Sequence, residues 1–339
     1  MIIRGVRFNY AFDQSGVRNF DGKGYPFHQY LHWVPGFDFT GSSFTAKTTT
    51  WESRLGKSYG EPGNMEMLRD GMTPAEFKPR CIYVTPYSWI RGAALNAVGL
   101  AGPGINALLA MQVWQDRAEP FQISLMALAK SRSERLHELS NMVSQIKQFL
   151  PFRSEFGVQL NISCPNVEHE EEVGSLVSET RESLAILRRL GDKVPLLIKI
   201  DALFPVWAAL AMCQDENCDG FCNSNAINWI HIPAEVRRKL FGTTESPLAD
   251  LGGGGLSGAS WLFDKVEAWI RQARAAGITK PIIGGGGILN VRQVDRLAWA
   301  GASAIAVGSV AFMRPWRVKK IIAHANELGR DGEFYGKCS

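Results

Sequence analysis

The sequence lacks the features that would place it in a membrane or on nucleic acid. No window reaches the roughly 18 consecutive apolar residues of a membrane span, and the first residues show no charged segment followed by a long apolar run. Charge of one sign is also weak, since 37 Lys and Arg stand against 33 Asp and Glu and no basic run marks a nucleic-acid face. These absences predict a cytoplasmic protein with neither a membrane anchor nor a nucleic-acid partner.

Cysteine is sparse, and its spacing has no metal-site or disulfide pattern. The six cysteines stand at positions 81, 164, 213, 218, 222 and 338, without a CxxC pair. We therefore expect reduced thiols and no bound metal. Two phosphate motifs are missing as well, because neither GxGxxG after a first strand nor GxxxxGK[ST] occurs. A dinucleotide or a hydrolysable triphosphate is therefore not the expected ligand.

What the sequence does contain is an alternation of short apolar runs with longer amphipathic segments. Strands are expected at 8–12, 36–48, 121–128, 157–163, 195–200, 220–224, 281–285 and 304–309, and helices at 104–118, 133–150, 176–191, 259–277 and 290–301. Roughly eight βα-type units predict a single (β/α)8 TIM barrel over residues 1–339, although this pattern also allows a doubly wound open sheet. Residues 51–90 and 226–252 lack periodicity and are interpreted as inserted loops or a lid.

Three glycine-rich segments follow late strands of the predicted barrel. They are "LGGGGLSGAS" (251–260), "IIGGGGI" (282–288) and "AVGSVAF" (306–312). Glycine lets backbone N–H groups approach an anion closely, and the last strands of a barrel often carry a phosphate site. Tight turns explain any single segment equally well. Because three occur together in the last third of the chain, the pattern favours a mononucleotide-type phosphate.

Polar residues end several apolar runs, where the active sites of barrels gather. They are Lys47, Asn161, Cys164, Asn166, Lys199, Asn223, Ser224 and Asn225, with Asn96 in a Gly/Pro-bounded segment. A buried lysine needs an anion or an electron-rich ring nearby, unless its amine reaches solvent at the rim. Asparagine suits a planar ligand edged with C=O and N–H groups, or forms a turn. Cys164 is either an inert thiol or a base, since a free thiol titrates near ~8.5.

The motifs "FTAKT", "ALNAVGLAGPG", "NISCPNV", "LLIKI", "CNSNAI", "GGGGLSGAS", "PIIGGGGI" and "AIAVGSVAF", in this order, resemble the dihydroorotate dehydrogenase family. "AFDQSG" is similar to the small-residue segment of that family's first strand, so the resemblance covers roughly residues 8 to 325. It implies a (β/α)8 barrel that holds FMN at its carboxyl-terminal mouth and oxidises dihydroorotate to orotate in pyrimidine biosynthesis.

The resemblance also implies a role for each matching residue. Cys164 would be the base that takes the C5 proton while the C6 hydride goes to the flavin, and Lys47 would lie near flavin and substrate. The implied substrate contacts are Asn96, Asn161, Asn166, Asn223 and Ser224. The implied flavin contacts are Ser15, Gly16, Lys47, Thr48, Asn161, Lys199, Gly258, Gly286, Gly287, Gly308 and Ser309.

The sequence resembles the soluble branch of the family at position 164, where members of that branch have a cysteine. Members of that branch are homodimers that reduce fumarate, or they pass electrons to NAD through a separate iron–sulfur flavoprotein subunit. We expect a homodimer with a possible electron-transfer partner subunit. This sequence departs from the family's pattern in its split "GN" (63–64) and "KPR" (78–80), its acidic "EHEEE" (168–172) and its Asn225. A flavoenzyme for another cyclic amide, such as dihydrouracil, and an idle barrel that binds a phosphorylated metabolite are therefore the alternatives.

Overall fold

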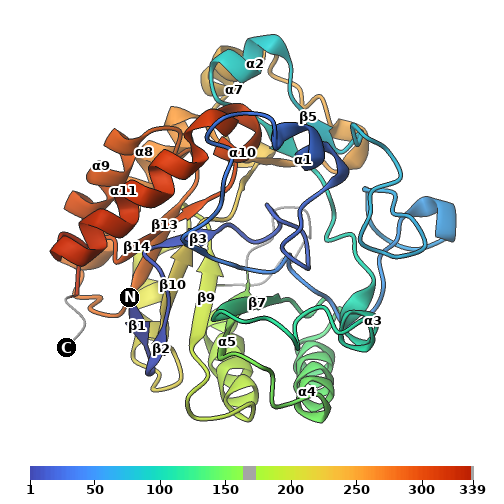
Figure 1. Cartoon of the computed structure of the whole chain (residues 1–339), viewed down its shortest axis with the longest axis vertical. Helices are drawn as coiled ribbons and strands as arrows, with labels where there is room; N and C mark the ends of the chain where they lie inside the picture. The colour runs from blue at the N-terminus through green and yellow to red at the C-terminus, as the bar shows by residue number, and fades with distance from the viewer. Residues whose placement is uncertain (163–172, 337–339) are drawn as a thin grey trace.

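The computed structural model describes residues 1–162 and 173–336, and at its centre lies a ring of eight parallel strands (Figure 1). They are β3 (Ala11–Asp13), β4 (Ser42–Ser43), β7 (Phe121–Leu125), β8 (Phe156–Asn161), β9 (Leu196–Ile200), β10 (Gly220–Asn223), β13 (Ile282–Gly285) and β14 (Ala304–Val307). Their order is β4-β3-β14-β13-β10-β9-β8-β7, and bridges from Thr45 to Gln122 and from Thr49 to Leu125 join the two end strands. The predicted (β/α)8 barrel is confirmed, with all eight strands at their expected places, because this closure rules out an open sheet.

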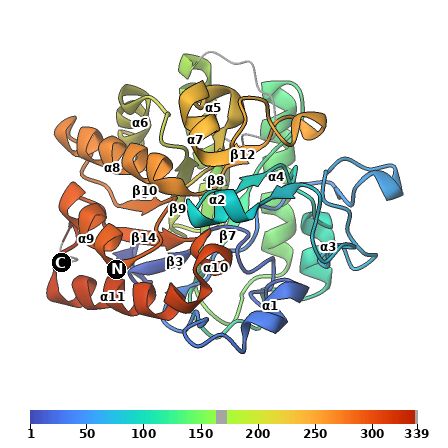
Figure 2. The same cartoon turned by 90° about the horizontal axis from the view of Figure 1, so that it is seen from above.

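Helices surround the ring (Figure 2). They are α1 (Pro26–Leu31), α2 (Pro86–Ile90), α3 (Gly104–Ala110), α4 (Arg132–Gln148), α5 (Val173–Arg188), α6 (Val206–Cys213), α7 (Ala234–Phe241), α8 (Ala259–Ala275), α9 (Val291–Ala300), α10 (Val310–Met313) and α11 (Val318–Asp331). The five predicted helices correspond to α3, α4, α5, α8 and α9. The other six lie outside the predicted helical patterns. None of the helices in the described part of the chain is long and apolar enough to cross a membrane.

Local sequence signals set the ends of the longer helices. Before α4, Ser131 Oγ accepts from the Glu134 amide at 3.3 Å and the Glu134 carboxylate accepts from the Ser131 amide at 3.0 Å. This reciprocal pair satisfies two donors that a helix start leaves open. Asn290 caps α9 by accepting from Gln293 N at 3.2 Å, and Gly301, at a φ of 100°, ends that helix.

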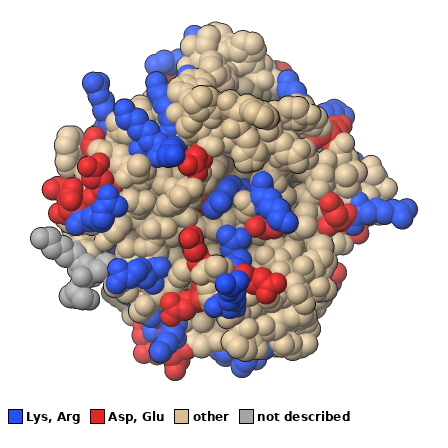
Figure 3. Space-filling model, in the orientation of Figure 1, with Lys and Arg blue, Asp and Glu red and all other residues tan. Residues whose placement is uncertain are grey.

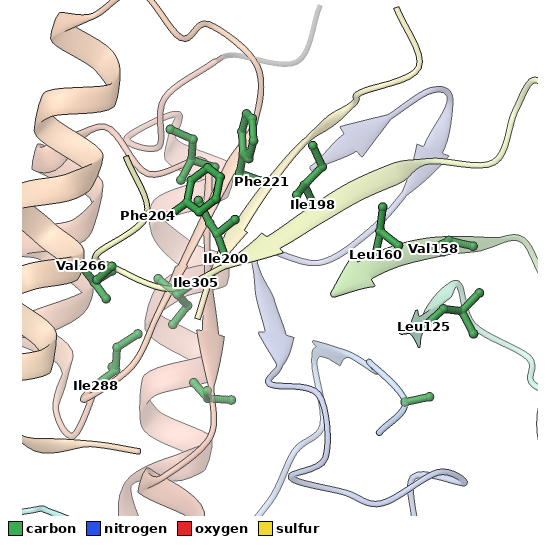
Figure 4. Close-up of a cluster of buried hydrophobic side chains, with 14 of the residues drawn as sticks. Leu125, Val158, Leu160, Ile198, Ile200, Phe204, Phe221, Val266, Ile288 and Ile305 are labelled. Carbon is green, nitrogen blue, oxygen red and sulfur yellow. The ribbon is translucent and has the colours of Figure 1, made fainter. Parts of the chain in front are cut away.

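The strands bury both of their faces. Side chains that point outward, among them Val158, Leu160, Ile198 and Phe221, pack under the helices (Figure 4). Side chains that point inward at the amino-terminal end of the barrel form a second apolar cluster around Phe12. The hairpin of β1 (Ile2–Ile3) and β2 (Val6–Arg7) adds side chains to that cluster and closes this end of the barrel. The amino-terminal half of the barrel is therefore a packed core.

Toward the carboxyl ends of the strands the interior becomes polar. Thr45 Oγ1 and Gln159 Nε2, from the two segments that flank β7, each lie 3.4 Å from Gln122 Oε1. Above this layer lie Lys47, Asn161 and Lys199, all at most 5% exposed. Because side chains alternate along a strand, the same phase that buries Leu197 in the apolar cluster brings Lys199 to the mouth.

The two long excursions and the residues that directly follow them form a small antiparallel sheet over this mouth. Its strands are β5 (Ile82–Tyr83), β6 (Leu95–Asn96), β11 (Ile227–Asn228) and β12 (Gly255–Leu256), in the order β11-β12-β6-β5. Asn64 Nδ2 also donates to Leu251 O at 3.2 Å, and Arg80 pairs with Asp250 at 3.4 Å. The excursions thus support each other, and their action as a lid stays a prediction.

Candidate active site

A cavity of about 530 Å³ opens at the carboxyl ends of the strands. Nine of the predicted site residues line it, namely Ser15, Gly16, Lys47, Thr48, Asn96, Asn161, Lys199, Gly308 and Ser309. Among the other lining residues, Gln14, Tyr25, His28, Ser257 and Phe312 were not predicted as site residues, and Asn225 was noted only as a polar residue at the end of an apolar run. This volume lies within the range of small-molecule and cofactor sites.

A chain of hydrogen bonds crosses the floor of the cavity. Thr48 Oγ1 lies 3.1 Å from Ser15 Oγ and 2.9 Å from Ser124 Oγ. Asn161 Nδ2 donates to Thr48 Oγ1 at 3.4 Å, and Asn225 Nδ2 donates to Asn161 Oδ1 at 2.8 Å. Side chains from the ends of five strands thereby form one polar surface whose donors and acceptors are held in fixed directions.

Lys47 is the buried cation at this floor. It is 5% exposed, and its Nζ has no hydrogen-bond partner among the described residues. Its Nζ lies over the ring faces of Phe20 and Tyr25, with centroids at 5.2 and 5.9 Å. Burial lowers the pKa of Lys47 to about 8. An anion or an electron-rich ring in the cavity would supply the interaction partner that this amine lacks among the described residues.

The wall that faces Lys47 comes from the segment after β3. Tyr25 Oη donates to Gly16 O at 2.8 Å, which fixes the ring that Lys47 faces. His28 accepts from Tyr25 N at 3.1 Å through Nδ1. Burial, with the nearby His32 and Arg18, lowers the pKa of His28 to about 4, so this part of the wall is neutral at physiological pH.

Asn96 reaches the cavity from the inserted sheet and not from the barrel. In β6 it pairs with Gly255 of β12, and its Nδ2 donates to Ser257 Oγ. The segments that directly follow the two excursions therefore hold Asn96 in place. The sequence could not show this, because the partners lie about 160 residues apart in the chain.

The glycine segments come together behind one end of the cavity. Gly308 and Ser309 line it, whereas Gly258, Gly286 and Gly287 do not. A Cβ on Gly287 would lie 2.4 Å from Ala259 O, and one on Gly258 would lie 3.3 Å from Ser309 Oγ. Glycine at 287 thus lets the start of α8 pack against the end of β13, next to the Ser309 side of the cavity. A phosphate contact for these glycines stays a prediction.

Asn223 and Ser224 do not line the cavity. Asn223 has the strand phase of Phe221, whose ring packs 6.3 Å from Trp269 of α8, outside the barrel. The side chain of Asn223 is 0% exposed, and neither of its amide atoms has a hydrogen-bond partner among the described residues. Asn225 lines the cavity instead, and the predicted substrate contacts of Asn223 and Ser224 stay untested.

Cys164 and Asn166 lie outside the described residues, so their roles stay predictions. The missed wall residues have no motif of their own. Tyr25 and His28 stand in the non-repeating segment between the first two strands. Asn225 had two signals in the sequence, namely its place at the end of an apolar run and its departure from the family's pattern.

Comparison with known proteins points to one family. The family model described as "Dihydroorotate dehydrogenase" matches residues 74–328. The catalytic subunit of dihydroorotate dehydrogenase B (NAD(+)) from Geobacillus kaustophilus is 29% identical over 274 residues, which is 79% of this chain and 82% of that protein. The Streptococcus pneumoniae catalytic subunit of the same name is 26% identical over 275 residues, covering 79% and 83%.

A solved structure supports the fold. The crystal structure of ligand-free dihydroorotate dehydrogenase from Eimeria tenella superposes with a TM-score of 0.62 at 16% identity, over 99% of this chain and 89% of that one. At this sequence identity the similarity supports the fold and no further conclusion.

Proposed function

This chain belongs to the dihydroorotate dehydrogenase family, and from that premise we propose that it oxidises dihydroorotate to orotate with a bound FMN. Members of this family are flavin-dependent enzymes. The observation that supports the proposal is the polar floor of the cavity, where Thr48, Asn161 and Asn225 form one hydrogen-bonded surface beside the buried Lys47. A pyrimidine ring edged with alternating C=O and N–H groups matches such a surface.

The residues fit a flavin mononucleotide. The unpartnered Nζ of Lys47 suits the electron-rich part of a flavin ring or the carboxylate of the substrate. Gly308 and Ser309, beside the start of α8, suit the phosphate. Lys199 would lie near the flavin ring and ribityl chain. When bound, the flavin supplies the chemistry of a hydride acceptor for C6 of the dihydropyrimidine.

The chain's own residues bind and orient the substrate in this proposal. Lys47 is mostly protonated at neutral pH, because its pKa is about 8. It therefore supplies positive charge at the buried floor of the cavity. Asn161 is held by Thr48 and Asn225, so its amide presents a fixed direction to the ring. Asn96, held by Ser257, would contact the substrate from the opposite wall.

Cys164 is the proposed base. Removing the C5 proton while a hydride leaves C6 converts the C5–C6 single bond into the double bond of orotate, so the thiolate takes one proton in each turnover. Burial usually raises a thiol pKa, and Lys47 is the proposed cation that favours the thiolate. Cys164→Ala should keep the flavin bound and slow its reduction by dihydroorotate. Reduction at the parent rate would show that Cys164 is not the base.

The relatives are named as catalytic subunits of NAD(+)-type enzymes. We therefore propose that electrons leave this chain through a separate partner subunit to NAD, in preference to fumarate. Formation of a homodimer stays an expectation.

The test is an anaerobic visible spectrum before and after dihydroorotate is added, followed by chromatography of the flavin released on denaturation. Bleaching of the flavin bands and release of FMN would support both halves of the proposal. FAD in the released fraction would contradict the cofactor. A flavin that stays oxidised with dihydroorotate would contradict the substrate, and dihydrouracil would then be the next compound tested.

A further inference from the structure

One exposed surface combines aromatic side chains and cations that the active site does not use. It is formed by α2, the 3-10 turn Pro315–Arg317 and the first turns of α9 and α11. We call it the arginine–tryptophan face, and its defining residues are Trp89, Ile90, Arg292, Trp316, Arg317 and Lys320. Figure 3 shows Lys and Arg side chains, with Asp and Glu side chains among them, at the upper left of the molecule, where Figure 1 places α8 and α9.

The aromatic part of this face is held rigidly. Trp89 and Trp316 have ring centroids 6.2 Å apart, and the Arg314 guanidinium lies 4.4 Å from the Trp89 ring. Arg314 also donates to Trp89 O at 3.1 Å and to Ile90 O at 3.0 Å, which ties the end of α2 down. Even so, Trp89, Ile90 and Trp316 remain 36%, 67% and 45% exposed. Large side chains that are already ordered lose little entropy when a partner covers them.

The three cations of this face form no ion pair with a described carboxylate. Arg292, Arg317 and Lys320 line a cavity of about 380 Å³, and no carboxylate in the described part of the chain lies within 4.0 Å of any of them. Arg317 Nη1 donates only to a backbone carbonyl, Leu289 O, at 3.1 Å. Burial and the charge of Arg317 lower the pKa of Arg314. Clustered like charges of this kind attract an acidic surface and repel a second copy of the same face.

The face also adjoins the active site. Trp89 Nε1 donates to Phe312 O at 3.4 Å, and Phe312 lines the active-site cavity. Figure 2 shows α2 and α10 next to each other above the strand ends. A partner on this face would therefore contact the outer side of the cavity wall.

We infer that the arginine–tryptophan face docks an acidic protein partner. Trp and Arg are the residues most enriched where binding energy concentrates in protein interfaces, and exposed apolar patches of this kind mark such interfaces. The inference identifies where the partner subunit of the proposed function binds, and in that respect it rests on that proposal. The binding itself requires neither substrate nor turnover.

The test uses the oxidised, flavin-containing protein without substrate, so a failure of the proposed reaction would not affect it. Calorimetry would measure binding of poly-L-glutamate and of a random Glu–Tyr copolymer. The double variant Arg292→Glu/Arg317→Glu should weaken both at least tenfold. The matched control Arg7→Glu/Lys193→Glu, which reverses two exposed cations in β2 and the α5–β9 loop, should change neither.

The aromatic contribution has its own readout. The copolymer should bind the parent protein more tightly than poly-L-glutamate does, by about threefold to tenfold. This is the gain in affinity expected from one aromatic contact. Trp316→Ala should remove that advantage and leave poly-L-glutamate binding unchanged. Flavin absorbance and circular dichroism confirm that each variant is folded.

Three outcomes would overturn the inference. Equal weakening by both double variants would show that overall charge, and not this face, attracts the polymers. Failure of poly-L-glutamate to bind the parent protein would exclude an acidic partner. Tighter binding to equimolar phosphatidylcholine–phosphatidylserine vesicles than to the copolymer would identify an anionic membrane as the occupant.

Discussion

Lys47 is a buried amine whose charge has a cost in the folded protein. Its pKa falls from 10.5 to about 8 because burial disfavours the charged form. Below pH 8 both the folded and the unfolded chain carry the proton, and the folded state bears the full desolvation cost. Between pH 8 and 10.5 the folded chain loses this proton first. Stability therefore rises with pH in this window, because the unfolded state binds more protons.

This gives a prediction for the flavin-free protein. The free energy of unfolding of the parent, relative to that of Lys47→Met, should rise by about 3 kcal/mol from pH 8 to pH 10.5. Urea titrations of both proteins across this range measure it, and the difference cancels every other group that titrates there. Parallel pH curves for the two proteins would show that the amine is not buried as described.

Asn223 offers a second prediction at the residue scale. Its amide is fully buried without a partner among the described residues, so a leucine of similar size should remove a desolvation cost. We expect Asn223→Leu to raise the free energy of unfolding by about 1–3 kcal/mol and to leave the KM for dihydroorotate unchanged. Asn225→Ala, which removes a hydrogen bond to Asn161, should raise that KM. A higher KM in Asn223→Leu would support the substrate contact predicted from the sequence.

At the scale of elements, the packing of α8 against β13 depends on Gly287. Its φ of 77° and the 2.4 Å that would separate a Cβ atom at this position from Ala259 O both exclude a side chain. Gly242, with a φ of 79° and nothing within 4 Å, is the matched control. Both alanine variants should lose about 1–3 kcal/mol from backbone strain, and Gly287→Ala should lose more because its Cβ would clash with Ala259 O. Only Gly287→Ala should also bind FMN more weakly, which flavin fluorescence would show, and equal FMN affinity in the two variants would contradict this account.

The pairing of α4 with α5 rests on a buried ion pair. Arg135 donates to Glu179 through Nε at 2.7 Å and through Nη2 at 2.6 Å. Removal of one partner leaves an uncompensated charge, so Glu179→Gln should cost about 3–5 kcal/mol. The exposed pair Arg132–Glu182, at 2.7 Å between the same helices, is the control, and Glu182→Gln should cost at most about 1 kcal/mol. Thermal unfolding monitored by circular dichroism compares them, and similar losses in both would contradict the role of burial.

For the whole molecule, the cofactor and the barrel should stabilise each other. A ligand that binds only the folded chain adds about 1.4 kcal/mol for each tenfold rise in its free concentration above Kd. FMN added to the flavin-free protein should therefore raise the unfolding temperature steadily with concentration. FAD at the same concentrations should raise it less, because the site proposed at Gly308 and Ser309 takes a terminal phosphate, which FAD lacks. An equal shift with both flavins would contradict FMN as the cofactor.

The strands of the barrel were predictable because their signal is local. Runs such as "LLIKI" are mostly apolar, and eight of them predict either a barrel or an open doubly wound sheet, between which the closed ring decides. The helices that were missed include α1, α2 and α10, which have six, five and four residues. Segments this short have too few turns to show a helical period, and tertiary contacts decide their conformation.

The sequence by itself determined the eight strands, the lysines and asparagines at their ends and the resemblance to the family, because each depends on local runs or on short motifs in a fixed order. Only the tertiary structure decided which side chains share the cavity. It placed Asn225 there, left Asn223 facing the helices, and brought Asn96 to Ser257 across about 160 residues. It also assembled the arginine–tryptophan face from segments more than 200 residues apart. Two things decide which side chains enter the cavity: the face of the sheet on which the last residues of a strand lie, and the contacts between distant loops. Both depend on the packing of the whole chain and are not visible in a local sequence pattern.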